Sequence, residues 1–250
     1  MSNTMISAAS AAGGDFRVGP VFSRAWDIGR RNADKFVLVT AIAGLPHLIA
    51  YLSATPPLMS PGRILLVSFL TLVMRLFLGT MSQAVLLHGA FQDMRGKPVH
   101  LGEAIHKGLS RFFPILGVAI LTSLGIVSAS LLLLVPGVIL AVRWAVALPV
   151  CMVEGLGPAA SIRRSAALTR GHRWKVFAIL LLLMIIGPFL GAVVASVFRS
   201  HAGPLVGALA YFAWTAIWGV LYYGVLTMVY HDLRAAKEGV DVEQLAAVFD

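Results

Sequence analysis

The chain of 250 residues is 58% hydrophobic and only 12% charged, against roughly 25% charged residues in an average soluble domain. This composition excludes an ordinary soluble domain. The formal net charge of +9 comes from basic residues gathered in a few segments, so it indicates a membrane topology signal and argues against nucleic-acid binding.

Six apolar runs cover most of the sequence, and each is long enough, or nearly so, to cross a hydrocarbon core of ~30 Å at ~1.5 Å per residue. They occupy residues 36–54, 64–91, 113–135, 138–153, 176–198 and 204–230. We therefore predict an all-α membrane protein with six transmembrane helices arranged as three hairpins, together with short cytoplasmic amphipathic helices. Residues 21–240 are expected to form this domain after a disordered tail at residues 1–20.

An amphipathic helix on the inner leaflet is expected at residues 21–34, because Phe22, Ala25, Trp26 and Gly29 recur at helical spacing.

The second run is longer than a membrane requires, so it must tilt or protrude.

Proline and glycine mark the next elements. Pro136-Gly137 joins runs three and four with almost nothing between them, which predicts a tight hairpin turn there. Run four is short and contains Pro149, so we expect it to be bent. A cytoplasmic helix is expected from Pro158 to Arg170, since proline at its start and glycine just past its end are typical boundaries. Residues 241–250 are expected to form a last short amphipathic helix.

A weak internal repeat relates the ends of runs two and six, where residues 91–95 read FQDMR and residues 230–234 read YHDLR. A simple duplication of one hairpin explains it best, but parallel repeats also occur in transporters.

Basic residues alternate along the chain. Sixteen of the twenty Lys and Arg lie before run one, between runs two and three, between runs four and five, and after run six, together with all eleven acidic residues. The other connections contain only Arg63 and Arg199. The positive-inside rule then predicts that both termini and the long loops are cytoplasmic.

Three stretches carry a resemblance to a known family: PGVILAVRW at residues 136–144 with the following Pro149 and Glu154-Gly155, ASIRRSAALTRGHRW at residues 160–174, and YHDLR with the following Glu238-Gly239. Together they resemble the membrane domain fused to some glycerophosphoryl diester phosphodiesterases, and its stand-alone six-helix relatives. The resemblance spans roughly residues 20–240. It implies a multi-pass protein of the bacterial inner membrane without an assigned activity, and the catalytic phosphodiesterase barrel has no counterpart here.

The sequence contains no catalytic or metal-binding motif, and no Asp or Glu lies inside an apolar run. Cys151 is the only cysteine, so it cannot form an intramolecular disulfide. We therefore expect no enzymatic activity, no cofactor and no metal.

Two arginines lie inside apolar runs. Arg75 is near the middle of run two, where an unpartnered charge costs ~3 kcal/mol or more, so we expect it to be buried in the bundle. It either lines an anion or lipid-headgroup site, or bonds across helices as a structural residue. Arg143 lies six residues past the predicted turn, and it either reaches outer head groups or bonds carbonyls freed near Pro149.

Arg163, Arg164, Arg170 and Arg173 are candidates for binding anionic head groups at the inner interface, where each basic residue contributes ~1 kcal/mol. The alternative is that they only set topology. The GxxxG patterns at residues 187–191 and 203–207 favour close helix packing within the bundle, or else self-association.

The expected function is that of a membrane protein without catalysis that binds or organises anionic lipid or a membrane partner. The alternative is a small transporter or permease component for an anionic or amphipathic solute, which a polar cavity reaching Arg75 would favour. The expected partners are membrane lipids, a second copy of the chain or another membrane protein.

Overall fold

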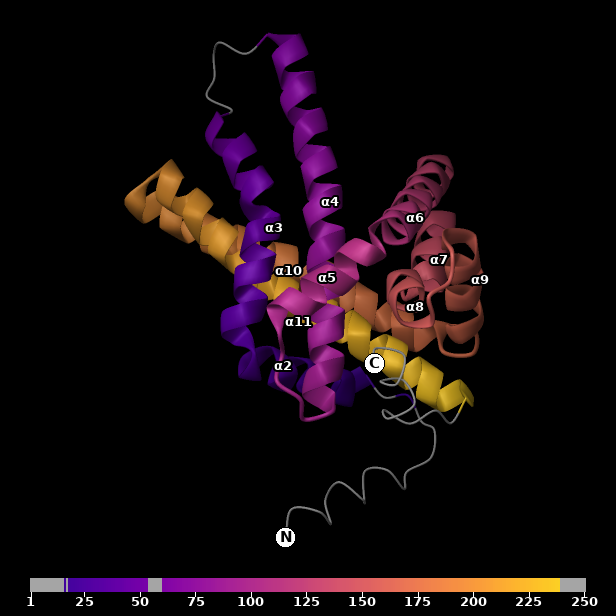
Figure 1. Ribbon diagram of the computed structural model, residues 1–250. Helices are drawn as coiled ribbons and strands as arrows, with labels where there is room; N and C mark the ends of the chain where they lie inside the picture. The colour runs from indigo at the N-terminus through magenta and orange to yellow at the C-terminus, as the bar shows by residue number, and fades with distance from the viewer. Residues whose placement is uncertain (1–15, 17, 54–59, 239–250) are drawn as a thin grey trace.

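The computed structural model describes residue 16 and residues 18–53 and 60–238, nearly all of them helical (Figure 1). The helices are α2 (Val18–Arg31), α3 (Ala33–Ser53), α4 (Pro61–Met94), α5 (Leu101–Ser110), α6 (Phe112–Leu132), α7 (Leu134–Trp144), α8 (Ala147–Glu154), α9 (Pro158–Leu168), α10 (Arg173–Ala202) and α11 (Pro204–Glu238). In this part of the chain, six helical stretches are long and apolar enough to cross a membrane, with α7 and α8 together counting as one. The predicted all-α membrane protein is confirmed on this basis.

The long helices pack in three consecutive pairs, α3 with α4, α6 with α7, and α10 with α11. We call the end of the molecule with Ser60, Leu133 and Gly203 the tip end, and the opposite end, with α2 and α9, the basic end. Figure 1 shows that the three tips point apart and that the α10–α11 pair crosses the α3–α4 pair obliquely. The helix pairs therefore diverge toward the tip end.

The buried core lies at the basic end. In α4 the buried residues fall between Thr80 and Gln92, and in α11 most of them fall between Val225 and Leu233. The first half of α4 is apolar but exposed, for example at Leu65 and Phe69. An exposed apolar surface of this kind suits hydrocarbon, so the tip-end halves fit the membrane and the basic-end halves form a packed protein core.

The turn between α6 and α7 corrects the sequence prediction. It lies at Leu133, whose backbone is extended (φ −157°, ψ 141°), and not at Pro136-Gly137. Pro136 instead occupies the first turn of α7, where its missing N–H removes no helical hydrogen bond. Gly137 serves close packing, because a Cβ at this position would lie 1.9 Å from the Ser130 hydroxyl oxygen.

The fourth membrane span is bent, as Pro149 predicted. Helix α7 ends at Trp144 and α8 begins at Ala147. The hydroxyl of Ser165 on α9 donates to the carbonyl of Arg143 (2.9 Å) and accepts from the N–H of Val146 (3.3 Å). The side of α9 that contains Ser165 therefore satisfies backbone groups that the bend leaves unpaired.

Helix α9 begins at the predicted Pro158 and ends at Leu168, two residues before the predicted Arg170 and before Gly171 with a φ of +92°. Helix α2 begins earlier than predicted and buries Val21, Ala25 and Ile28, while Trp26 is exposed. The helix expected at residues 241–250 lies outside the described residues.

The GxxxG pattern of α10 packs within the molecule. A Cβ at Gly187 would lie 2.1 Å from Nε1 of Trp218, and one at Gly191 would lie 2.7 Å from Cδ1 of Trp214. Trp214 also donates to the carbonyl of Gly187 (2.9 Å). These contacts favour packing between α10 and α11, the first of the two alternatives.

Candidate ligand-binding cavity

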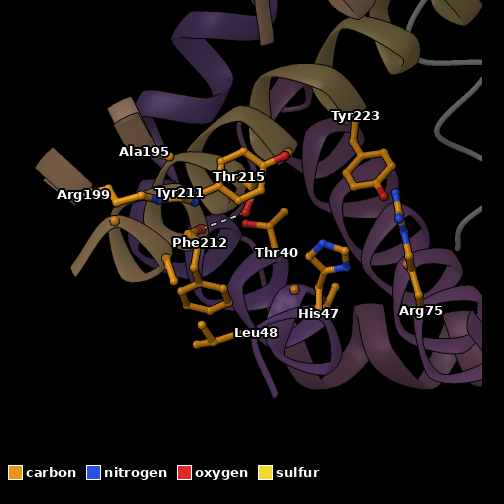
Figure 2. A pocket seen from close by; sticks show the side chains of 16 residues that line it. Thr40, His47, Leu48, Arg75, Ala195, Arg199, Tyr211, Phe212, Thr215 and Tyr223 are labelled. Atoms are coloured by element: carbon orange, nitrogen blue, oxygen red, sulfur yellow. Dashed lines mark hydrogen bonds between the residues drawn. The ribbon is translucent and has the colours of Figure 1, made fainter. Parts of the chain in front are cut away.

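A cavity of about 410 Å³ lies between the α3–α4 pair and the α10–α11 pair (Figure 2). This volume is within the range of small-molecule sites, which is about 300–1,000 Å³. The lining residues come mostly from the tip-end halves of the four helices, where the two pairs diverge. The oblique crossing of the pairs therefore creates the cavity.

Arg75 of α4 lines this cavity, about 21 Å along the helix from Pro61 at ~1.5 Å per residue. Its guanidinium acts electrostatically on the hydroxyl of Tyr223, and Figure 2 shows the two groups beside each other. Arg75 forms no hydrogen bond or ion pair with any other described residue, and its side chain is exposed. The expected burial of Arg75 is therefore wrong, because the open cavity takes the place of a packed protein partner.

The described residues that line the cavity include two arginines and no carboxylate. Arg199 lies at the opposite end from Arg75, and His47 lies between them (Figure 2). None of the described Asp or Glu residues lines the cavity. The charge of Arg75 is consequently not neutralised within the described protein, although an unpaired charge at membrane depth is costly. An anionic group in the cavity would offset that cost.

Small residues make room for a ligand. Gly44 and Gly219 line the wall, where a Cβ would meet Phe212 at 3.1 Å and Thr40 at 3.2 Å, respectively. At Gly79 the nearest atom to an added Cβ is the hydroxyl oxygen of Tyr223, at 3.9 Å. The cavity thus combines two arginines with largely uncharged walls, an arrangement that suits an anion carrying an apolar part.

Buried Thr40 closes the cavity toward the basic end. Its hydroxyl lies 2.7 Å from the carbonyl oxygen of Ala216 on α11, and 2.9 Å from the carbonyl oxygen of Phe36 in its own helix. The exposed cationic residues are therefore at the mouth of the cavity, and the buried hydroxyl is at its floor.

The other predicted intramembrane arginine lies elsewhere. Arg143 is in the last turn of α7, and its Nε is buried without a hydrogen-bond partner among the described residues. Its carbonyl accepts from Ser165, so the backbone near Pro149 is bonded by α9 and not by the Arg143 side chain.

The predicted cluster on and after α9 divides into two groups. Arg163, Arg170 and Arg173 are exposed. Arg164 pairs with Glu154 (2.9 Å) and with Glu238.

Arg164 belongs to a closed ring of polar groups. Tyr230 donates to Glu154 (3.2 Å), and Arg234 donates to both Tyr230 (3.2 Å) and Glu238 (3.0 Å). Because two arginines and two glutamates balance in this ring, Arg164 is much less available to lipid than its three neighbours.

Sequence reasoning identified Arg75 but missed the other cavity residues. In the sequence, Arg199 lies in the connection between runs five and six and His47 lies inside run one, and neither position carries a motif. Tyr223 carried no sequence signal beyond its place in an apolar run. Within the described ranges, no three His, Cys, Asp or Glu side chains lie close enough together to hold a metal ion.

These features define a multi-pass α-helical membrane protein with a cavity between two pairs of its long helices. Residues 114–231 match the family of the membrane domain of glycerophosphoryl diester phosphodiesterase, and the resemblance noted in the sequence is confirmed over these residues. The match includes Arg199 and Tyr223, whereas Arg75 and His47 precede it. No curated protein and no solved structure matches the chain.

Proposed function

We propose that this protein binds an anionic lipid without catalysing a reaction on it, and that the phosphate of the head group lies at Arg75. One observation carries the proposal: among the described residues Arg75 has no hydrogen-bond or ion-pair partner, and those that line its cavity include a second arginine and no carboxylate. A guanidinium binds phosphate through two parallel N–H donors, which a lysine cannot reproduce.

Lipid is favoured over a soluble anion because of where the cavity lies. Its walls are formed by helices whose apolar side chains are exposed along the tip-end halves, such as Ile49 of α3 and Leu209 of α11. Leu48 and Phe212, which line the cavity itself, are half-buried. A lipid can place its phosphate at Arg75 and leave its acyl chains in the surrounding bilayer. Inorganic phosphate has no apolar part that could contact the apolar side chains of these walls.

We also propose that the basic end faces the cytoplasm of a bacterial cell, because the basic residues gather there. In this orientation Arg163, Arg170 and Arg173 would contact anionic head groups of the inner leaflet. The exposure of these three arginines, beside Trp174, which is 82% exposed, favours this second, peripheral contact.

The test is retention of phosphatidylglycerol by the purified protein, measured by native mass spectrometry against phosphatidylcholine. Arg75→Gln should lower the preference for phosphatidylglycerol at least fivefold, and Arg75→Lys should restore only part of it. Arg63→Gln is the matched control, since it removes the same charge from the same helix outside the cavity.

Filling the cavity gives an independent variant. Gly79→Leu projects toward the Tyr223 hydroxyl and should also lower retention, whereas Gly62→Leu, with open space around its Cβ, should not. Equal lipid retention by Arg75→Gln and Arg63→Gln would refute the proposal. If inorganic phosphate displaced phosphatidylglycerol and occupied the site as fully as the lipid does, the ligand would be a soluble anion instead.

A further inference from the structure

The interface between α3 and α11, which we call the seam, contains a hollow at each end. The first is the cavity with Arg75. The second is a groove of about 150 Å³ at the basic end, lined by α2, α3 and α11, with Arg30 on its rim. Arg30 is exposed and forms no ion pair with another described residue.

One stripe of α3 connects the two hollows. Ala33 and Val37 line the groove, and Thr40, Gly44 and His47 line the cavity. The spacing of these residues is four, three, four and three, so they follow a single face of the helix. The two hollows are therefore successive openings along the same contact with α11.

The barrier between the hollows is about one helical turn thick, or ~5 Å. It consists of the contact of Thr40 with α11: the hydroxyl lies 2.7 Å from the carbonyl oxygen of Ala216, and a Cβ at Gly219 would lie 3.3 Å from the Thr40 Cβ. A single hydrogen bond of this kind contributes only about 0.5–1.5 kcal/mol. On the groove side, Val37 and Val220 are the residues next to this contact.

Helix α3 also contains a point where it can bend. Pro46 lies inside the helix, where it removes one backbone hydrogen bond, and it stands on the tip-end side of Thr40. Bending of α3 at this proline would move its tip-end part, including His47, relative to α11 and so change the width of the cavity beyond Thr40. The closure itself opens only when the contact of Thr40 with Ala216 and Gly219 is broken.

We propose that the seam is a path along which the head group of an anionic lipid passes between the two leaflets. Arg75 and Arg30 would bind the head group in turn, and the Thr40 contact would close the path between them. This inference rests on the proposed binding function. The acyl chains stay in the bilayer while the charged group, which hydrocarbon solvates poorly, moves between cationic sites.

The experiment is a lipid-scrambling assay with the full chain in liposomes containing NBD-labelled phosphatidylglycerol, in which dithionite bleaches only the outer leaflet. The seam is closed by a disulfide between Thr40→Cys and Gly219→Cys in a Cys151→Ser background. The separation of 3.3 Å is close to the Cβ–Cβ distance of ordinary disulfides, which is about 3.5–4.5 Å. The control disulfide joins Ala84→Cys and Gly108→Cys, also 3.3 Å apart but between α4 and α5, outside the seam.

Oxidation of the seam disulfide should slow scrambling at least tenfold, and reduction should restore it, while the control disulfide leaves the rate unchanged. An unchanged rate with a fully formed seam disulfide would overturn the path, as would unmodified protein that scrambles no faster than empty liposomes. Phosphatidylglycerol retention separates the two proposals: Arg75-dependent retention without scrambling leaves binding intact and rejects only the path, whereas loss of both rejects the binding site itself.

Discussion

Asp93 of α4 and Asp232 of α11 each form an ion pair with an arginine of α2, Arg31 and Arg24 respectively. The two aspartates occupy the same place in the repeated segments 91–95 and 230–234. Since Arg24 and Arg31 are two helical turns apart, they lie on one side of α2, which bridges the basic ends of the first and third helix pairs. The hydrogen bonds with Asp93 raise the pKa of Arg31, so this end of the bridge remains charged at physiological pH.

Replacement of Asp93 should weaken this bridge. Asp93→Ala removes the contacts with Arg31 and with the side-chain amide of Asn32 (2.8 Å). We expect a loss of about 1–2 kcal/mol, because Asp93 is mostly buried although Arg31 is half exposed. Thermal unfolding in detergent, followed by tryptophan fluorescence, would measure it. Asp27→Ala on exposed α2 surface is the control, and equal unfolding midpoints for the two variants would contradict the prediction.

Helix packing around Gly187 should be intolerant of any side chain. Gly187→Leu must displace Trp218 and disturb its stacking on Trp214, so the unfolding midpoint should fall by several degrees. Size-exclusion chromatography should show an unchanged oligomeric state, because this surface is used inside the molecule. A stable variant with an altered oligomeric state would instead support self-association through Gly187.

Local signals in the sequence predicted much of the fold. The lengths of the apolar runs, Pro149 in run four and the Pro158 and Gly171 boundaries each depend on a few neighbouring residues. The turn predicted at Pro136-Gly137 was wrong because a Pro-Gly pair is typical of turns but also occurs inside helices. Proline is tolerated in the first turn of a helix, and glycine is required where another segment packs closely. Only the packing against Ser130 separates these meanings.

The cavity could be predicted only in part. Arg75 was identifiable because a charge in an apolar run requires an explanation. Its neighbours were not, since Arg199 and His47, which are 152 residues apart in sequence, reach the same space only through the oblique crossing of two helix pairs. Tilt between helices is determined by packing, which single-sequence patterns do not encode.

Arg163 and Arg164 are adjacent but should behave differently. Arg164→Gln removes the contacts with Glu154 and Glu238 and leaves the mostly buried Glu154 with fewer partners, so we expect a loss of about 1–3 kcal/mol. Arg163→Gln removes the same charge from an exposed position and should leave the unfolding midpoint unchanged, within error, while lowering phosphatidylglycerol retention slightly. The reverse pattern in thermal unfolding would show that the polar ring does not stabilise the protein.

Topology can be tested with single cysteines in a Cys151→Ser background. Cysteines replacing Ser60 and Ser200 at the tip end should react with a membrane-impermeant maleimide added to intact cells. A cysteine replacing Ser2 should react only after the membrane is permeabilised. Labelling of the Ser2 position in intact cells would reverse the orientation proposed for the basic end.

The tip between α6 and α7 differs from the other two. Leu131, Leu132, Leu133, Leu134 and Val135 are between 67% and 83% exposed, and contact with water would cost on the order of 10 kcal/mol at about 2 kcal/mol per side chain. This tip therefore ends in hydrocarbon. The other two tips, at Ser60 and Ser200, carry polar residues and reach the membrane surface. Lipid of the tip-end leaflet would then fill the space beyond this tip and between the diverging helix pairs.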